Sequence, residues 1–368
     1  MNKISRLEVY QVNIRLSEPF TVALGTVNTI TAILVRIEDN KGNIGWGEAS
    51  PTPIVLGDTP ESVISCIDLI APRLIGEEPI RIERIHALMD DTIHGNTSAK
   101  AALDIALYDL MGKIFGQPLA CLLGGYRDKI ETDACIGIKD PKRTAEEAME
   151  RVKEGFKVIK VKVGIDPHED LKRIRLMRGQ IGEDIRIRID ANQGWTPREA
   201  VRVLSKMQPF DIELVEQPVK WYDIVGLGLV RRSTSIPVMA DESVHQPADA
   251  LEVLRNNAVD YINIKLMKSG GVNKALKIAA IAEAADIECI VGQMFETNIA
   301  TTAAAHFATA VNNIYSTDLD SELFREDDPI VEGGARIEGG CMILPDAPGL
   351  GINVKEKLLG EPIKVYKL

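Results

Sequence analysis

Val158-Ile-Lys160-Val-Lys162 is a short apolar run that carries two lysines, and similar runs with charged ends follow it at a nearly even interval. Strands buried in a parallel sheet normally read as continuous Val/Ile/Leu runs, so repeated charges at their ends are a chemical signal. The interval of about 25 residues matches one strand plus one helix of a (β/α) barrel. The other runs lie at 187–192, 212–218, 238–242, 261–265 and 317–320.

The alternation of strand and helix patterns predicts an α/β protein built on an eight-stranded parallel barrel. We predict its strands at 131–138, 157–163, 185–190, 212–216, 236–241, 259–265, 287–293 and 314–318, with amphipathic helices such as 197–207 and 272–284 between them. A doubly wound open sheet is the alternative, but the sequence has no GxGxxG phosphate loop to support it.

The first part of the chain does not alternate strand and helix patterns in this way, which predicts a separate α+β domain at 1–125. Its strands are expected at 4–16, 31–38 and 44–47, and its helices at 60–74, 81–89 and 98–115. We assign 126–322 to the barrel. The Gly- and Pro-rich segment 323–368 is expected to return to the N-terminal domain.

Composition excludes several classes of partner. The 368 residues carry a net charge of −11 and no cluster of Lys and Arg, so no nucleic-acid partner is expected. We find neither a signal peptide nor an apolar run long enough to cross a membrane, so no membrane partner is expected. The five cysteines are scattered without CxxC spacing, which is typical of reduced thiols in a cytoplasmic protein.

Three carboxylates end three consecutive predicted strands: Asp190, Glu216 and Asp241. Because the carboxyl ends of barrel strands meet at one face, these side chains should converge. Three hard oxygen ligands without His or Cys suit Mg²⁺, with Mn²⁺ as a possible substitute. The alternative is that they are solvated loop carboxylates, which fits a single acidic residue better than three in register.

Lys160, Lys162 and Lys265 end strands on opposite sides of these carboxylates. Burial, neighbouring ammonium groups and a divalent cation would lower a lysine pKa toward neutrality, which would make it a usable base. Two bases facing one carbon next to a carboxylate could remove its proton from one face and return it on the other, which inverts that carbon. Structural salt bridges are the alternative, and Lys268 is expected to be a surface or helix-capping residue.

The motifs Lys160-Val-Lys162, Asp190-Ala-Asn192, Glu216-Gln-Pro218, Asp241-Glu242-Ser243 and Asn263-Ile-Lys265 resemble the enolase superfamily, in its muconate-lactonizing-enzyme subgroup. This resemblance covers nearly the whole chain and implies a (β/α)₇β modified TIM barrel under an α+β capping domain formed by the N-terminal region and the C-terminal tail. It implies Mg²⁺ at Asp190, Glu216 and Asp241. It further implies Lys162 and Lys265 as the acid/base pair, with Lys160 supporting the enolate. We expect Asn192 and Glu242 to support the ligands from behind. The segment after the seventh strand, Gly292-Gln-Met-Phe-Glu296, has no His, which argues against the mandelate-racemase branch.

Asp318-Leu-Asp320 resembles the DxD motif of dipeptide epimerases of the L-Ala-D/L-Glu type, where two carboxylates hold the substrate's ammonium group. The implied reaction inverts the α-carbon of the second residue of an L,L-dipeptide, a small-molecule substrate. The alternatives are o-succinylbenzoate synthase, N-acylamino-acid racemase or cycloisomerase chemistry at the same site, or a non-catalytic protein that binds a metal and a small molecule. We also expect a homo-oligomer.

The side chain of the substrate's second residue is expected to be selected by the loops 20–28 and 50–58. Epimerases of the Ala-Glu type carry an Arg in the first loop, whereas this chain has Gly25 there, and the second loop is apolar. A neutral or hydrophobic second residue is therefore predicted. The predicted substrate-binding residues beyond the DxD pair are Gly25, Thr26, Ile54, Cys135, Met294 and Phe295.

Overall fold

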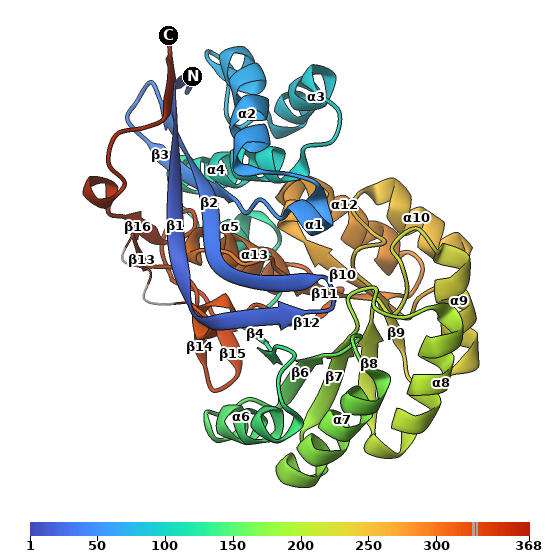
Figure 1. Ribbon diagram of the computed structural model, residues 1–368. Coiled ribbons are helices and arrows are strands. Elements are labelled where there is room, and N and C mark those ends of the chain that lie inside the picture. The colour runs from blue at the N-terminus through green and yellow to red at the C-terminus, as the bar shows by residue number, and fades with distance from the viewer. Residues whose placement is uncertain (326–327, 329) are drawn as a thin grey trace.

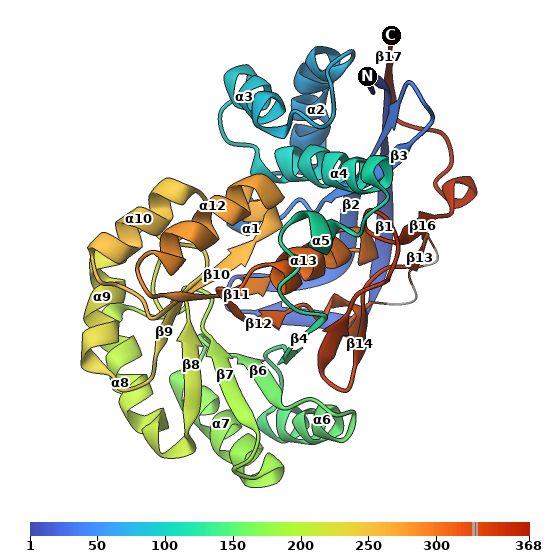
Figure 2. The same ribbon diagram turned by 180° about the vertical axis from the view of Figure 1, so that it is seen from behind.

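The computed structural model describes residues 1–325, 328 and 330–368. An eight-stranded parallel sheet lies beside a smaller antiparallel sheet (Figures 1 and 2). Its strands follow chain order, and a parallel bridge between Thr132 and Thr317 joins the two ends of the sheet. The predicted barrel is therefore confirmed. The strands are β5 (Ala134–Ile136), β6 (Val158–Lys162), β7 (Arg186–Asp190), β8 (Ile212–Glu216), β9 (Val238–Ala240), β10 (Tyr261–Lys265), β11 (Glu288–Gly292) and β12 (Ile314–Asp318).

Helices connect successive strands and cover the outside of the barrel (Figure 1). In α8 (Pro197–Met207), Thr196 and Glu199 form a capping box, and the buried Ala200, Val203, Leu204 and Met207 repeat at helical spacing. The others are α6 (Pro141–Lys153), α7 (Pro167–Ile181), α9 (Ile224–Ser233), α10 (Pro247–Arg255), the short α11 (Leu266–Ser269), α12 (Val272–Glu283) and α13 (Asn298–Ala310).

The first predicted barrel strand, 131–138, is too long. Only β5 joins the parallel sheet, whereas β4 (Lys129–Glu131) pairs antiparallel with β15 (Cys341–Ile343), which also pairs with β14 (Arg336–Glu338). The chain before β5 therefore pairs with a distant C-terminal hairpin, which local sequence does not reveal.

The N-terminal sheet has the order β17-β1-β2-β3, formed by β1 (Ile4–Val22), β2 (Gly25–Asp39), β3 (Ile44–Ala49) and β17 (Lys364–Lys367). Its helices are α2 (Pro60–Leu74), α3 (Ile82–Thr92) and α4 (Thr97–Phe115). β17 is the last strand of the chain, so the C-terminal tail completes this sheet (Figure 2). The domain boundaries 1–125, 126–322 and 323–368 stay predictions.

The β1–β2 hairpin is longer than predicted, because Phe20 pairs with Val27 and Val22 with Gly25. Most of the expected loop 20–28 is therefore strand, and the hairpin bends where its register shifts between Arg15 and Phe20. The backbone N–H of Ile138, just beyond β5, donates to the carbonyl of Thr21 at 2.8 Å. The hairpin tip consequently lies at the carboxyl end of the barrel.

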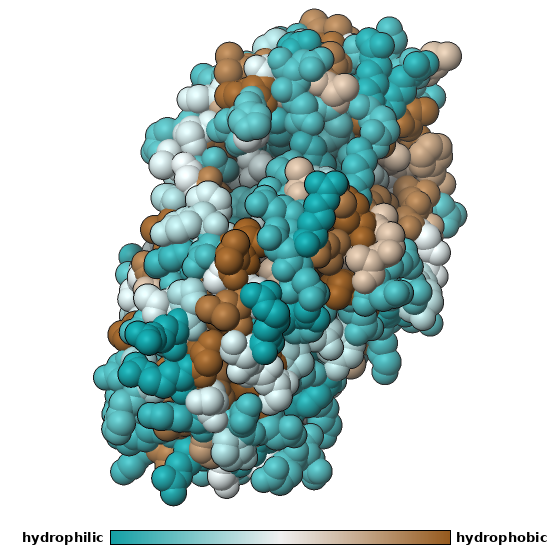
Figure 3. All heavy atoms as spheres, turned by 90° about the vertical axis from the view of Figure 1, so that its right-hand side faces the viewer, coloured by the Kyte–Doolittle hydropathy of each residue, from teal (hydrophilic) through white to brown (hydrophobic). Residues whose placement is uncertain are grey.

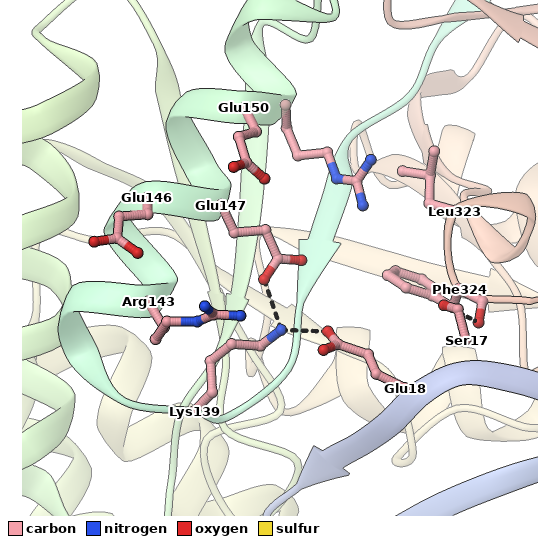
Figure 4. A pocket seen from close by; sticks show the side chains of 10 residues that line it. Ser17, Glu18, Lys139, Arg143, Glu146, Glu147, Glu150, Leu323 and Phe324 are labelled. Carbon is pink, nitrogen blue, oxygen red and sulfur yellow. Dashed lines mark hydrogen bonds and ion pairs between the residues drawn. The ribbon is translucent and has the colours of Figure 1, made fainter.

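A charged pocket of about 310 Å³ flanks this hairpin (Figure 4). Lys139 lies between two carboxylates, at 2.5 Å from Glu18 on β1 and 2.6 Å from Glu147 on α6. Ser17 donates from its backbone to the carbonyl of Phe324 at 2.7 Å. These contacts fasten the hairpin to both sides of the seam between β5 and β12.

The remaining elements are short. They are α1 (Pro53–Leu56), α5 (Leu119–Leu122), β13 (Val331–Gly333), β16 (Ile352–Val354) and the 3₁₀ turns Gln208–Phe210, Ser321–Leu323 and Glu356–Leu358. In the described part of the chain, none of the helices combines the length and apolar character needed to cross a membrane.

Candidate active site

The charged strand ends predicted from the sequence lie at one level of the barrel. Lys162 on β6 is in register with Asp190 on β7, and Asp190 is in register with Glu216 on β8. On the other side, Lys265 on β10 is in register with Gly292, which is in register with Asp318 on β12. All of these charged side chains are buried. The structure therefore brings the predicted cluster together.

Lys160 lies among three carboxylates. Its Nζ is 2.5 Å from Glu216 Oε2, 2.6 Å from Asp318 Oδ2 and 3.3 Å from Asp190 Oδ2. An ammonium group that is only 1% exposed is tolerated here because these negative charges surround it.

Lys162 and Lys265 each pair with a different carboxylate. Lys162 Nζ is 2.6 Å from Asp190 Oδ2, and Lys265 Nζ is 2.8 Å from Asp241 Oδ2. Burial opposes the charged form of both lysines, but the paired carboxylates outweigh it and raise the pKa of each. The lowering of the lysine pKa values expected from the sequence depends on a bound divalent cation beside these carboxylates, and it stays a prediction.

Asp190, Glu216 and Asp241 suit a hard divalent cation. All three are at most 1% exposed, and Glu216 Oε2 and Asp241 Oδ1 have no hydrogen-bond partner. These two oxygens lie 2.5 Å from Lys160 and 2.6 Å from Lys268 as ion pairs, outside hydrogen-bonding geometry. Burial and the neighbouring Asp190 raise the pKa of Glu216 to about 7, because ionised Glu216 adds a further negative charge to this buried cluster. An oxygen-only donor set with unsatisfied buried oxygens fits Mg²⁺.

Asn192 links one of these carboxylates to Glu242, and the supporting role predicted for both residues stays a prediction. The backbone N–H of Asn192 donates to Asp190 Oδ1 at 2.8 Å, and its side-chain amide donates to Glu242 Oε1 at 3.4 Å. Burial and Asp241 raise the pKa of Glu242 to about 8.

Lys268 was expected at the surface, and that expectation is wrong. It is 1% exposed, its Nζ lies 2.6 Å from Asp241 Oδ1, and it also donates to the backbone carbonyls of Asp241 and Asn263. The α11 turn directly after β10 folds this side chain back under the strand ends. The spacing of three residues from Lys265, which a short helical turn keeps on nearly the same side, was the available signal.

Asp318 and Asp320 are both buried at the seam of the barrel but differ in their partners. Asp318 contacts Lys160, whereas Asp320 Oδ2 accepts a hydrogen bond from the backbone N–H of Cys135 at 2.5 Å. Burial opposes ionisation of Asp318, but Lys160 outweighs it and keeps the pKa of this carboxyl low. Burial and the adjacent Asp318 raise the pKa of Asp320 to about 7.

Sequence reasoning missed Asp133 and Arg188. One oxygen of Asp133 lies within 4.8 Å of an oxygen of both Asp318 and Asp320, and among the described residues no other group of three or more acidic, His or Cys side chains is as compact. Arg188 Nη1 lies 3.0 Å from Asp133 Oδ2. Asp133 and Arg188 precede Cys135 and Asp190 by two residues, so strand alternation could have placed both on the inward face.

The predicted specificity residues do not lie together in one place. Cys135 packs in a cluster with Phe20, and Phe295 joins that cluster with its ring 5.3 Å from that of Phe20. Met294 is 9% exposed and belongs to the main core cluster. Gly25 and Thr26 begin β2 at the hairpin tip.

Ile54 lies in a separate pocket of about 610 Å³ at the barrel mouth, which also borders Glu242. Its walls come from the hairpin tip, the α1 segment and the loops after β7, β8 and β9. The residues that line it are Leu24, Ile54, Val55, Leu56, Gly57, Gln193, Trp221, Tyr222, Ile224, Glu242, Ser243, His245, Asp249 and Glu252.

A parallel barrel whose strand ends gather lysines and carboxylates beneath a mixed α+β domain defines a two-part protein of enolase-like architecture. Family models agree: residues 4–124 match the mandelate racemase / muconate lactonizing enzyme N-terminal domain, and residues 143–358 match the enolase C-terminal domain-like family. The chain belongs to this mandelate racemase / muconate lactonizing enzyme family.

Individual relatives match over nearly their full length. The L-Ala-D/L-Glu epimerase of Bacillus subtilis (strain 168) is 44% identical over 98% of this chain and 99% of its own. The hydrophobic dipeptide epimerase of Enterococcus faecalis is also 44% identical, over 95% of this chain and 99% of its own. A crystal structure of the dipeptide epimerase from Enterococcus faecalis V583, complexed with Mg and the dipeptide L-Leu-L-Tyr, superposes with a TM-score of 0.93 at 44% identity, covering 95% of this chain and 99% of that one.

Proposed function

We propose that this protein is a Mg²⁺-dependent dipeptide epimerase, an isomerase that inverts the α-carbon of the second residue of an L,L-dipeptide. The observation that carries the proposal is the placement of Lys162 and Lys265 on β6 and β10, with the carboxylate-bearing strands β7, β8 and β9 between them. The dipeptide epimerases among the relatives support the same reaction.

Each lysine would serve one face of the substrate's α-carbon. One Nζ accepts the α-proton, and the other Nζ delivers a proton to the opposite face, so the carbon inverts. Lys160 remains positively charged beside the developing enolate because three carboxylates hold its proton. Asp190, Glu216 and Asp241 would hold Mg²⁺, which when bound supplies positive charge for the substrate's carboxylate.

Asp318 and Asp320 would hold the substrate's N-terminal ammonium group. Both are buried beside Lys160, on the side of the barrel away from Asp241. Burial raises the pKa of Asp320. A cation placed against this carboxylate would stabilise its ionised form.

A neutral or hydrophobic side chain suits the second residue. None of the described residues that line the 610 Å³ pocket is a Lys or Arg, whereas Leu24, Ile54 and Val55 are apolar. Burial lowers the pKa of His245, which also lines this pocket, to about 4, so at neutral pH a glutamate side chain would find no cation there and would lie close to Glu242. The name of the Enterococcus faecalis relative, a hydrophobic dipeptide epimerase, supports this choice.

A screen in D₂O tests the proposal. Pools of L,L-dipeptides are incubated with the protein and Mg²⁺, and mass spectrometry follows uptake of one deuterium at the α-carbon of the second residue. We expect uptake with dipeptides that end in neutral or hydrophobic residues, and loss of that uptake with EDTA. No uptake across a broad pool, or uptake only with N-acyl amino acids, would contradict the proposal.

We also infer that the protein acts in the cytoplasm as a homo-oligomer. The cysteines are all free, which suits a reducing compartment. Trp221, Tyr222 and Val225 are 56%, 67% and 73% exposed, and apolar side chains form patches on the face shown in Figure 3. Light scattering during size-exclusion chromatography measures the number of copies, and a monomer would contradict the inferred association.

A further inference from the structure

Three carboxylates meet at the seam of the barrel. Asp133 precedes β5, Asp318 ends β12 and Asp320 follows it, and one oxygen of each lies within 4.8 Å of the other two. The seam itself holds them together, because the backbone N–H of Asp133 donates to the carbonyl of Thr317 at 3.1 Å. All three are at least nine-tenths buried.

Protein cations balance only two of these carboxylates. Lys160 lies 2.6 Å from Asp318, and Arg188 lies 3.0 Å from Asp133. Among the described residues, no Lys, Arg or His forms an ion pair with Asp320. In addition, Asp133 Oδ1 is buried without a hydrogen-bond partner. The cluster therefore has one carboxylate without a cation and one buried acceptor without a donor, which is costly unless a cationic donor binds there.

We propose that Asp133 is the third carboxylate of the site that binds the substrate's ammonium group, together with Asp318 and Asp320. This inference rests on the proposed function and adds a residue to it. A primary ammonium group has three N–H donors, and the cluster offers it one carboxylate for each. An N-acylated amine has one N–H and no charge, so the site discriminates against it.

Nearby positive charge favours an ammonium ion over a second metal ion. Arg188 and Lys160 already contact two of the three carboxylates, and they would repel a divalent cation more strongly than a single positive charge. Burial and Asp318 raise the pKa of Asp133. Such a rise is expected for closely spaced carboxylates that have no cation bound between them.

The test compares two ligands of nearly the same shape. L-Alanyl-L-leucine carries the ammonium group, and propionyl-L-leucine lacks it. Isothermal titration calorimetry with saturating Mg²⁺ measures the affinity for both, so the result does not depend on turnover. For Asp133→Asn we expect the affinity for the dipeptide to fall about tenfold or more, since a charged hydrogen bond is lost, while the affinity for propionyl-leucine stays within about twofold.

Two further variants keep the test decisive. Glu213→Gln removes another partner of Arg188, at 2.5 Å from its Nε, and should leave the preference for the amine unchanged. If Asp133→Asn fails to fold because Arg188 keeps only Glu213 as a partner, the double variant Asp133→Asn/Arg188→Met removes both buried charges and should show the same loss of preference.

Several outcomes would overturn the inference. One is an equal fall in affinity for both ligands, and another is an unchanged preference for the dipeptide. A wild-type protein that binds both ligands equally would also overturn it. Equilibrium dialysis would overturn it if Asp133→Asn lost one bound Mg²⁺ while it kept its dipeptide affinity, because the three carboxylates would then hold a metal. Absence of deuterium uptake in the wild-type screen, with the amine preference intact, would instead count against the epimerase proposal alone.

Discussion

Lys268 shows how a single buried charge is kept in place at this site. Its ammonium group lies 2.6 Å from Asp241 Oδ1 and is only 1% exposed. Burial disfavours the charged form of Lys268 and lowers its pKa. Burial also opposes ionisation of Asp241, but Lys265 and Lys268 outweigh it and hold the pKa of that carboxyl well below its usual range. Each charge of the pair therefore offsets the free-energy cost of burying the other.

Replacing Lys268 should consequently destabilise the fold. Lys268→Met leaves Asp241 with Lys265 alone, and removal of one partner of a buried pair costs about 3–5 kcal/mol of unfolding free energy. Urea unfolding measures the change. Lys274→Met is the matched control, because Lys274 pairs at 2.9 Å with Asp90, which is 41% exposed, and its loss should cost about 1 kcal/mol or less. A similar small loss in both variants would contradict the buried pairing.

At the scale of single residues, the sequence predicted the charges on strand ends but not their neighbours. Asp190, Glu216 and Lys162 were predictable because alternation places them inward and parallel strands end at one face. Asp133 and Arg188 were not predicted because neither lies at the carboxyl end of a strand. Alternation could place both side chains inward, but a polar residue in either place has many structural uses, so their part in the cluster follows only from their contacts in space.

Among the secondary-structure elements, β3 and α4 of the N-terminal domain pack against each other with their backbones in close contact. β3 passes so close to α4 that a Cβ on Gly47 would lie 2.0 Å from the carbonyl oxygen of Ala102 and 2.6 Å from the backbone nitrogen of Ala106. Helix backbone cannot move away without disturbing the buried face of α4, because its residues are almost all in the core. Only glycine fits at this crossing.

Gly47→Ala should therefore lower the free energy of unfolding by about 3 kcal/mol or more, since overpacking against backbone is not relieved by side-chain rotation. Gly179→Ala on α7 is the control, because no atom beyond its chain neighbours and the nearby backbone of its own helix lies within 4 Å of the added Cβ. A glycine inside a helix costs about 0.5–1 kcal/mol relative to alanine, so the control should be neutral or stabilising. Thermal and urea unfolding measure the change in stability of both variants. An unchanged unfolding free energy for Gly47→Ala would contradict the close packing.

Elements with strong local signals were predicted well. The helix expected at 60–74 is α2 (Pro60–Leu74), where Thr59 and Ser62 form a reciprocal cap and Pro60 occupies the first turn. The tip of the β1–β2 hairpin and β4 were not predicted, because their conformations depend on partners more than a hundred residues away, such as Ile138 for the hairpin and β15 for β4. Local patterns contain no information on such pairings.

For the whole molecule, the arrangement of strands around the barrel explains the proposed chemistry. Lys162 and Lys265 lie on strands separated by β7, β8 and β9, and Asp318 and Asp320 lie at the seam where β12 meets β5. The N-terminal hairpin reaches over this face and contributes Leu24 to the pocket at the barrel mouth. The predicted specificity residues lie apart, with Ile54 in this pocket and Cys135 and Phe295 in the Phe20 cluster, because they come from elements whose docking only the complete fold determines.

The central claim is that Lys162 and Lys265 serve opposite faces of one α-carbon. Its most direct test uses Lys162→Met and Lys265→Met with the pure L,L and L,D forms of one active dipeptide in D₂O, followed by ¹H NMR of the α-proton. We predict that both variants lose inversion and that each still exchanges the α-proton of one diastereomer only, a different one in each variant. Inversion that survives in either variant, or exchange of the same diastereomer in both, would contradict the account.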